Sequence, residues 1–229
     1  MILFFIDNNC IIASQYKKIL FMNKLVLLSV FTLLVACKGL FAQDLSYGVK
    51  AGMNISNFLS DDNSDEYDSK AGINIGAFLE ISFSDKFSIQ PELMYSGQGS
   101  QQTLYFDGEE VGARDFRKYK YKFDYLNIPV LAKYYVMDGL SIQAGPQLGV
   151  LLSADDRIET DNVGDGEVEI DITSLAEPID FSFDFGIGYE FGNHLLIDAR
   201  YNVGLTNVVD SNDETLKNSV FQFSVGYKF

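Results

Sequence analysis

The stretch KAGINIGAFLEISF, residues 70–83, alternates apolar side chains with small or polar ones over its whole length. Strict alternation of this kind is typical of a β-strand whose two faces meet different surroundings. The stretch is also long, because strands in soluble sheets usually have only about 5–6 residues. Strands that cross a bilayer at a tilt need about 9–11 residues.

Seven further segments alternate in the same way and have similar lengths. They are 47–57, 87–98, 125–136, 140–152, 179–191, 195–206 and 219–229. Three connections between them are short, at 84–86, 137–139 and 192–193, and the remaining connections are long and polar. Short turns at one end, long loops at the other and an even strand number are typical of outer-membrane barrels.

The sequence therefore predicts an all-β fold, an eight-stranded antiparallel up-and-down transmembrane barrel with both chain ends in the periplasm. A closed barrel leaves no strand edge unpaired in lipid. The alternative is a soluble barrel with its apolar face inside. An eight-stranded barrel has little interior space, and here the polar face is rich in glycine while the apolar face is bulky and aromatic. This difference in volume favours the membrane barrel.

Composition excludes some classes of function. The 229-residue chain has a formal net charge of −15 and a pI near 4.3, so it repels nucleic acid. Its two cysteines, Cys10 and Cys37, both lie near the N-terminus, and the remaining chain can form neither a disulfide nor a zinc–thiolate cluster. We expect no cofactor and no resident metal.

Residues 22–42, MNKLVLLSVFTLLVACKGLFA, have the pattern of a signal peptide: a lysine, an apolar run too short for a permanent span, and an alanine before Gln43. We expect residues 1–42 to be an extension plus a cleaved signal peptide, with Met22 as the true start, and 43–229 to be the barrel domain. LVAC at 34–37 also resembles a lipobox, so lipidation of Cys37 is the alternative.

The closing stretch SVFQFSVGYKF, residues 219–229, resembles the C-terminal signal that the barrel assembly machinery reads. Its alternating apolar residues are Phe221, Phe223, Val225, Tyr227 and Phe229.

Several stretches together resemble the PorT-like outer-membrane β-barrel family of Bacteroidetes, over about 46–229. They are YGVKAGMNISNF (47–58), FSIQPELMYSGQG (87–99), YLNIPVLAKYYV (125–136), LSIQAGPQLGVLLS (140–153), FDFGIGYEF (183–191) and LLIDARYNVGLTNV (195–208). The resemblance implies an eight-stranded integral barrel. One member of that family is linked to type IX secretion, and most have no assigned role.

The polar face carries nine charged residues that the barrel would turn inward. They are Lys50, Glu80, Glu92, Lys133, Asp184, Glu190, Asp198, Arg200 and Lys228. Two neighbouring carboxylates such as Glu80 and Glu92 could carry out acid–base chemistry. The alternative is an interior network of ion pairs that fills the barrel. The near balance of cations and anions favours the network and argues against a pore.

No catalytic arrangement is evident. Lipid-modifying barrels commonly use a histidine with a serine near the outer leaflet, whereas the one histidine, His194, lies at a predicted periplasmic turn. The long loops 59–69, 154–178 and 207–218 are acidic but match no EF-hand loop, and we expect them to be solvated. We predict that the protein is not an enzyme.

The segment RKYKYK, residues 117–122, lies in a predicted long loop at 99–122. By strand parity Lys118, Lys120 and Lys122 point outward at headgroup height, where we expect them to contact lipid A phosphates. A bulge near Asp124 would reverse that parity.

These features predict an integral outer-membrane barrel that acts as a structural or interaction module. The expected partners are outer-membrane lipid, lipopolysaccharide and the barrel assembly machinery. The alternative is an accessory component of a secretion or envelope-assembly complex, with envelope or secretion proteins as partners. A lipid-modifying enzyme is a third, less favoured, class.

Overall fold

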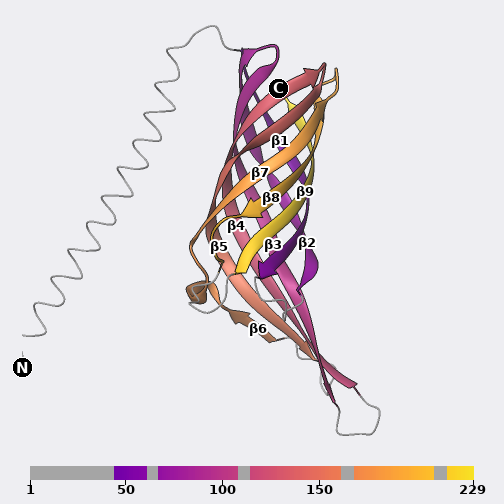
Figure 1. Ribbon diagram of the computed structural model, residues 1–229, viewed down its shortest axis with the longest axis vertical. Helices are drawn as coiled ribbons and strands as arrows, with labels where there is room; N and C mark the ends of the chain where they lie inside the picture. Colours follow the sequence, from indigo (N-terminus) through magenta and orange to yellow (C-terminus); the bar gives the residue numbers. More distant parts are fainter. Residues whose placement is uncertain (1–43, 61–66, 108–113, 161–167, 209–215) are drawn as a thin grey trace, which may run out of the picture. The chain divides into compact units, whose positions relative to one another are not determined.

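Eight antiparallel strands close into a barrel, and a ninth, short strand lies outside the ring (Figure 1). The computed structural model describes residues 44–60, 67–107, 114–160, 168–208 and 216–229. The barrel strands are β1 (Asp44–Ser60), β2 (Asp68–Ser84), β3 (Phe87–Asp107), β4 (Arg114–Met137), β5 (Leu140–Thr160), β7 (Ile179–Glu190), β8 (Leu195–Gly204) and β9 (Leu216–Lys228). The short strand is β6 (Val168–Asp171), which is followed by a 3-10 turn, η2 (Thr173–Leu175).

Each barrel strand pairs with its neighbours along the chain, and β9 pairs with β1 to close the ring. β5 pairs with β4 on one side. On its other side it pairs first with β7, over 140–150, and then with β6, over 155–158. The predicted eight-stranded antiparallel barrel is therefore confirmed, and β6 is an addition that the alternation did not indicate.

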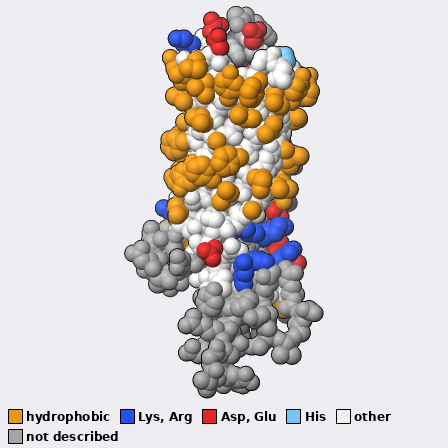
Figure 2. All heavy atoms as spheres, turned by 90° about the vertical axis from the view of Figure 1, so that its right-hand side faces the viewer, with side chains coloured by type: hydrophobic (Ala, Val, Ile, Leu, Met, Phe, Trp, Pro, Cys, Tyr) orange, Lys and Arg blue, Asp and Glu red, His pale blue; other side chains and the backbone are white. Residues whose placement is uncertain are grey.

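The apolar faces of the strands point outward and form a belt around the barrel (Figure 2). Exposed apolar side chains run from Ile73 to Phe83 on β2, from Ile128 to Val136 on β4 and from Ile142 to Leu152 on β5. The alternate positions face the interior and are mostly polar and buried. A soluble barrel would have the reverse arrangement, and the belt therefore defines the membrane-spanning part of each strand. No helix among the described residues is long and apolar enough to cross a membrane.

The predicted loop at 99–122 was wrong. β3, with 21 residues, continues to Asp107, and β4, with 24 residues, begins at Arg114, so most of the predicted loop is strand. The two strands form a long hairpin beyond the belt (Figure 1). The predicted loop at 154–178 was also wrong in part, since β5 continues to Thr160. These segments are richer in polar and charged residues than the parts of the strands within the belt, and such a composition also fits a loop.

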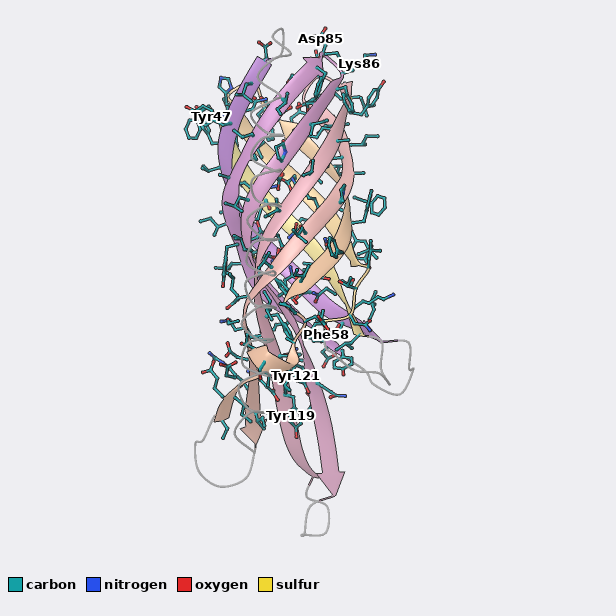
Figure 3. The ribbon with its side chains drawn as sticks, turned by 90° about the vertical axis from the view of Figure 1, so that its left-hand side faces the viewer. Tyr47, Phe58, Asp85, Lys86, Tyr119 and Tyr121 are labelled. Atoms are coloured by element: carbon teal, nitrogen blue, oxygen red, sulfur yellow. The ribbon has the colours of Figure 1, made fainter. Side chains whose placement is uncertain are left out.

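The short turns and the C-terminus lie at the other end of the barrel, as the positions of Asp85 and Lys86 show (Figure 3). Phe229 donates its backbone N–H to the carbonyl of Tyr47 at 2.7 Å, and the two rings are 5.5 Å apart. The last residue thus lies on the seam between β1 and β9. The predicted signal peptide, residues 1–42, lies outside the described residues.

Candidate functional site: the charged interior and the basic rim

Glu92 on β3 is the centre of a buried group of charges in the middle of the barrel. Arg200 on β8 binds it through two hydrogen bonds, from Nη1 to Oε2 at 2.8 Å and from Nη2 to Oε1 at 2.7 Å. Lys50 on β1 binds the same carboxylate at 2.8 Å. Asp198 lies 3.1 Å from Arg200 Nε and 3.6 Å from Lys50 Nζ. Two cations and two carboxylates thus neutralise one another across the lumen.

A second group of charges lies nearer the short turns. Lys133 Nζ is 3.3 Å from Glu80 Oε2, and Ser88 donates its hydroxyl to Glu80 Oε1 at 2.9 Å. Tyr135 also donates its hydroxyl to Glu80. Lys228 pairs with Glu190 and lies 3.7 Å from Glu80. Hydrogen-bond donors and cations thus surround the Glu80 carboxylate, which leaves it poorly placed to act as a free base.

Asp184, the remaining predicted interior charge, has no ion pair within 4.0 Å among the described residues. It is buried, and Asn202 donates an amide N–H to its Oδ1 at 2.9 Å. Asp180, which the prediction did not include, is also buried and accepts hydrogen bonds from Thr206 and Asn218. The structure therefore places all nine predicted charges on the inner side of the wall, eight of them in ion pairs.

An aromatic cluster closes the barrel at the end away from the short turns, where Phe58 and Tyr121 lie (Figure 3). Its buried aromatic members are Phe58, Phe123 and Tyr125, and the buried Ala154 and Val208 pack with them. Phe58 and Phe123 meet edge to face at 5.5 Å. This cluster was not predicted, although Phe58 occupies an inward position and interrupts the polar face there. This apolar packing, together with the two charge groups, fills the interior at three heights.

His194 lies in the exposed turn before β8, where its φ is 67° and its ring stacks edge-on against Tyr227 at 6.2 Å. In the chain segments that the structure describes, no three or more His, Cys, Asp or Glu side chains gather where they could hold a metal ion. The geometry thus gives His194 the surroundings of a rim residue.

Basic side chains gather just beyond the belt, on the long-strand side (Figure 2). Phe123 and Tyr125 of β4 face the interior, so Lys118, Lys120 and Lys122 lie on the outer face. The irregularity near Asp124 lies in β5: Asp124 pairs with Ser153 and Tyr125 with Leu151, so the extra residue belongs to β5 and the parity of β4 is kept.

Two further cations lie near this region and were not among the predicted site residues, and register places one of them, Lys70, on the inward face with Ser56. Lys70 on β2 donates its ammonium to the carbonyl of Tyr121 at 2.9 Å, across β3 at Gly99. Gly99 has a φ of 133°, and a Cβ there would lie 2.0 Å from the same carbonyl oxygen. Arg157 on β5 is paired in register with Lys120. The positions of Lys70 and Arg157 could not be predicted from the sequence, because they depend on how β2, β3 and β5 are aligned with β4.

The charges in this region perturb one another. Burial, and then the positive charge of Lys122, lower the pKa of Lys70 to about 8, with Asp124 opposing. Lys122 binds Asp124 at 2.7 Å, and this hydrogen bond raises the pKa of Lys122. Arg157 binds Glu169 on β6 at 3.1 Å. Register also places Asp155 of β5 opposite Lys122, so cations and carboxylates lie side by side in this region.

An outward apolar belt around a filled polar interior defines a transmembrane β-barrel of the outer-membrane class. The chain belongs to the outer membrane protein beta-barrel domain family, whose sequence model matches residues 41–210. The protein is accordingly an integral outer-membrane β-barrel.

The chain is also similar to solved structures of outer-membrane proteins. Neisserial surface protein A is 12% identical with a TM-score of 0.50, over 81% of this chain and 99% of that one. Ail of Yersinia pestis is 12% identical with a TM-score of 0.46, over 80% and 98%. OprG of Pseudomonas aeruginosa is 13% identical with a TM-score of 0.39, over 80% and 95%. Such identities bear on the fold alone. No curated protein matches the sequence.

Proposed function

We propose that this protein is a non-enzymatic structural and interaction module of the outer membrane. The observation that carries the proposal is the occupied interior: ion pairs span the lumen at two heights, and aromatic side chains close it at one end. A barrel of this size with such an interior has no continuous path for solutes. Its interactions then fall to the surfaces outside the membrane, above all the long β3–β4 hairpin.

Planar-bilayer recordings test the proposal. The refolded barrel should insert without producing steady conductance. If inserted, folded barrels gave a reproducible conductance, the interior would be open, and the result would contradict the proposal and indicate transport. Barrel purified in its folded form from the outer membrane should retain bound outer-membrane components if the interaction role is right.

Membership of the PorT-like family, and with it an accessory role in a secretion or envelope-assembly complex, is the second candidate. It rests on the resemblance of stretches such as 125–136 and 140–153. Cross-linking in intact cells followed by purification separates the two: stoichiometric secretion or periplasmic proteins would favour the second candidate, together with lost secretion on deletion. Recovery of the barrel with lipid alone would exclude it.

Export through a cleaved signal peptide completes the proposal. Mass spectrometry of the mature protein should find Gln43 as the first residue. An acylated Cys37 as the first residue would contradict cleavage before Gln43 and would indicate a lipoprotein anchor.

A further inference from the structure

We propose that strand β6 (Val168–Asp171) docks an extended segment of a partner protein in which apolar and basic residues alternate, and that this segment joins the sheet as a further strand. The inference rests on the proposed function, since it names the kind of partner that such an interaction module binds. The partner lies outside the membrane, at the end of the barrel that the aromatic cluster closes.

β6 lies beyond the membrane belt (Figure 1). The belt ends on β5 at Leu152, and Asp156, four residues further along β5, is the register partner of Ile170 on β6. At about 3.3 Å per residue, Ile170 is therefore about 13 Å from the end of the belt along the strand. A strand tilt of about 35–45° reduces this to roughly 10 Å along the membrane normal. Ile170 thus lies outside the hydrocarbon, and acyl chains do not cover it.

The apolar residues of β6 share the inner face of the projecting sheet. Val168 and Ile170 pair in register with Ile158 and Asp156 of β5. By strand parity these two residues share a face with Ala154, which packs in the aromatic cluster. Val168 and Ile170 are therefore directed toward the barrel axis and away from the surrounding lipid.

This inner face continues outward from the aromatic cluster and becomes more exposed with distance. Ile172 packs against the cluster and is half-buried, whereas Ile170 is 44% exposed and Val168 is 53% exposed. Tyr119 and Tyr121 of β4 lie on the same face (Figure 3). A sheet with one apolar face buries that face against another element, and an exposed apolar surface in water marks an interaction site.

The backbone of β6 has a free edge. Among the residues that the structure describes, β6 pairs with β5 alone and is the last strand of the sheet. The N–H and C=O groups along its other side therefore have no neighbouring strand to bind. An extended peptide can add at such an edge, where main-chain hydrogen bonds supply affinity and alternate side chains supply specificity.

The side chains of β6 specify an apolar and basic partner strand. Val168 and Ile170 lie on one face, and Glu169 and Asp171 lie on the other. Register also places Asp171 directly opposite Asp155 of β5, and like charges in that position repel each other. Asp171 has no ion pair among the described residues. A basic residue opposite Asp171 on the added strand would offset the repulsion, whereas an acidic strand would be rejected.

The sheet already contains one strand of this kind. The segment RKYKYK of β4, residues 117–122, alternates basic and aromatic residues and pairs with the other edge of β5. Tyr119 lies opposite Ile158 there, and Lys122 lies opposite Asp155. The same pattern on the free edge of β6 would set tyrosines opposite its two apolar residues and lysines opposite its two acidic ones. A peptide of this sequence is therefore a suitable probe.

The test measures binding of the synthetic peptide RKYKYK, acetylated and amidated at its ends, to the folded barrel in nanodiscs of zwitterionic lipid. Isothermal titration calorimetry gives the affinity, and empty nanodiscs give the background. Wild type should bind the peptide saturably. Val168→Ser combined with Ile170→Ser should weaken binding about tenfold, since two apolar cross-strand pairs are lost, and Asp171→Asn should weaken it about threefold.

Leu175→Ser and Asp85→Asn are the matched controls. Leu175 is 64% exposed and lies in η2, outside the strand, and Asp85 is exposed in a short turn at the opposite end of the barrel (Figure 3). The two changes remove apolar surface and a negative charge away from β6, and both should leave binding unchanged. The charge-reversed peptide EEYEYE and the rearranged peptide KKKYYR should bind far more weakly than RKYKYK.

Alternate N-methylation of the peptide tests the backbone contact. In an added strand the amides of the three lysines point to one edge, and those of the arginine and the tyrosines point to the other. Methylation of one set should abolish binding, and methylation of the other set should leave it unchanged. An equal effect of both sets would exclude strand addition.

The proposal would be overturned if wild type did not bind RKYKYK, or if the Val168→Ser, Ile170→Ser variant bound it as tightly as wild type does. Equal binding of RKYKYK and EEYEYE would also overturn it. Each variant is first checked for the heat-dependent gel shift of a folded barrel. A folded barrel that neither conducts nor binds the peptide contradicts this inference alone, whereas a conducting barrel contradicts the proposed function whether or not it binds.

Discussion

Arg200 on β8 and Glu92 on β3 form a bidentate ion pair across the full width of the barrel, with distances of 2.8 and 2.7 Å. In the ring of eight strands, β3 and β8 are separated by three strands in either direction. The pair therefore joins opposite walls. Lys50 and Asp198 bind the same two side chains, so no member of the group is left as an isolated charge.

Arg200→Met should lower the free energy of unfolding by about 3 kcal/mol, because it leaves buried carboxylates with one cation fewer. Arg200→Met combined with Glu92→Gln should lose less than the single change. Equilibrium unfolding in micelles measures both. Arg157→Met breaks an exposed ion pair and serves as the control, with an expected loss of about 1 kcal/mol or less. An equal loss of unfolding free energy in Arg200→Met and Arg157→Met would contradict the view that the buried charges stabilise the barrel.

Phe58→Ala should cost about 3–5 kcal/mol, since it removes a buried ring from the aromatic cluster. Leu59→Ala, at the next and exposed position, should cost about 0.5 kcal/mol or less. Unfolding in micelles gives the free energies, and proteolysis of the β3–β4 hairpin reports whether the cluster holds that end of the barrel. A Phe58→Ala barrel as stable as Leu59→Ala would show that the cluster contributes little.

Lys70 should titrate near pH 8, well below the ordinary 10.5 for lysine. Between these values the unfolded chain binds the proton more readily than the folded barrel does, so this residue makes the barrel more stable as pH rises through that window. NMR titration of isotope-labelled dimethyl-lysine would detect it, with Lys70→Arg to assign the signal. Asp124→Asn removes the one opposing negative charge and should lower the midpoint further. A midpoint near 10.5 would contradict the burial of Lys70 and its closeness to Lys122.

Phe229→Ser should reduce the amount of folded barrel in the outer membrane several-fold if the C-terminal residues are an assembly signal. Tyr47→Ala removes the same ring contact without changing the terminal residue, and it isolates the structural part of the effect. The readout is the heat-dependent gel shift of outer-membrane fractions, with refolding in detergent as the second measurement. An equal defect in both variants, in cells and in detergent, would reduce Phe229 to a packing role.

Period-two alternation was enough to predict which residues form the wall, and the difference in side-chain volume between the two faces predicted which face points outward, because each of these properties is local to a strand. The outer limits of β3, β4 and β5 were missed. The strands continue past Gln101 and Tyr119, where polar and charged residues become frequent. Apolar content reports immersion in lipid, and strands that project beyond the membrane do not need it.

Contacts within the site were only partly predictable. The interior charges could be found from parity, but the pairing of Arg200 with Glu92 depends on how far each strand is shifted against its neighbours around the ring. The same dependence hides Lys70, which is 51 positions from Tyr121 in the sequence and hydrogen-bonded to it in the structure. Phe58 could have indicated the aromatic cluster, because it is an apolar residue on an otherwise polar face.

Single-cysteine scanning along β2 tests the central claim most directly, namely that this barrel turns its apolar face to lipid and its polar face inward. The chain beyond residue 43 contains no cysteine, so each introduced thiol reports alone. Spin labels at Ile73, Ile75 and Leu79 should be accessible to oxygen dissolved in the bilayer and shielded from a water-soluble nickel complex. Labels at Asn74 and Glu80 should be shielded from both. Access of the nickel complex to the Ile73, Ile75 and Leu79 labels would contradict the membrane barrel and indicate a soluble one.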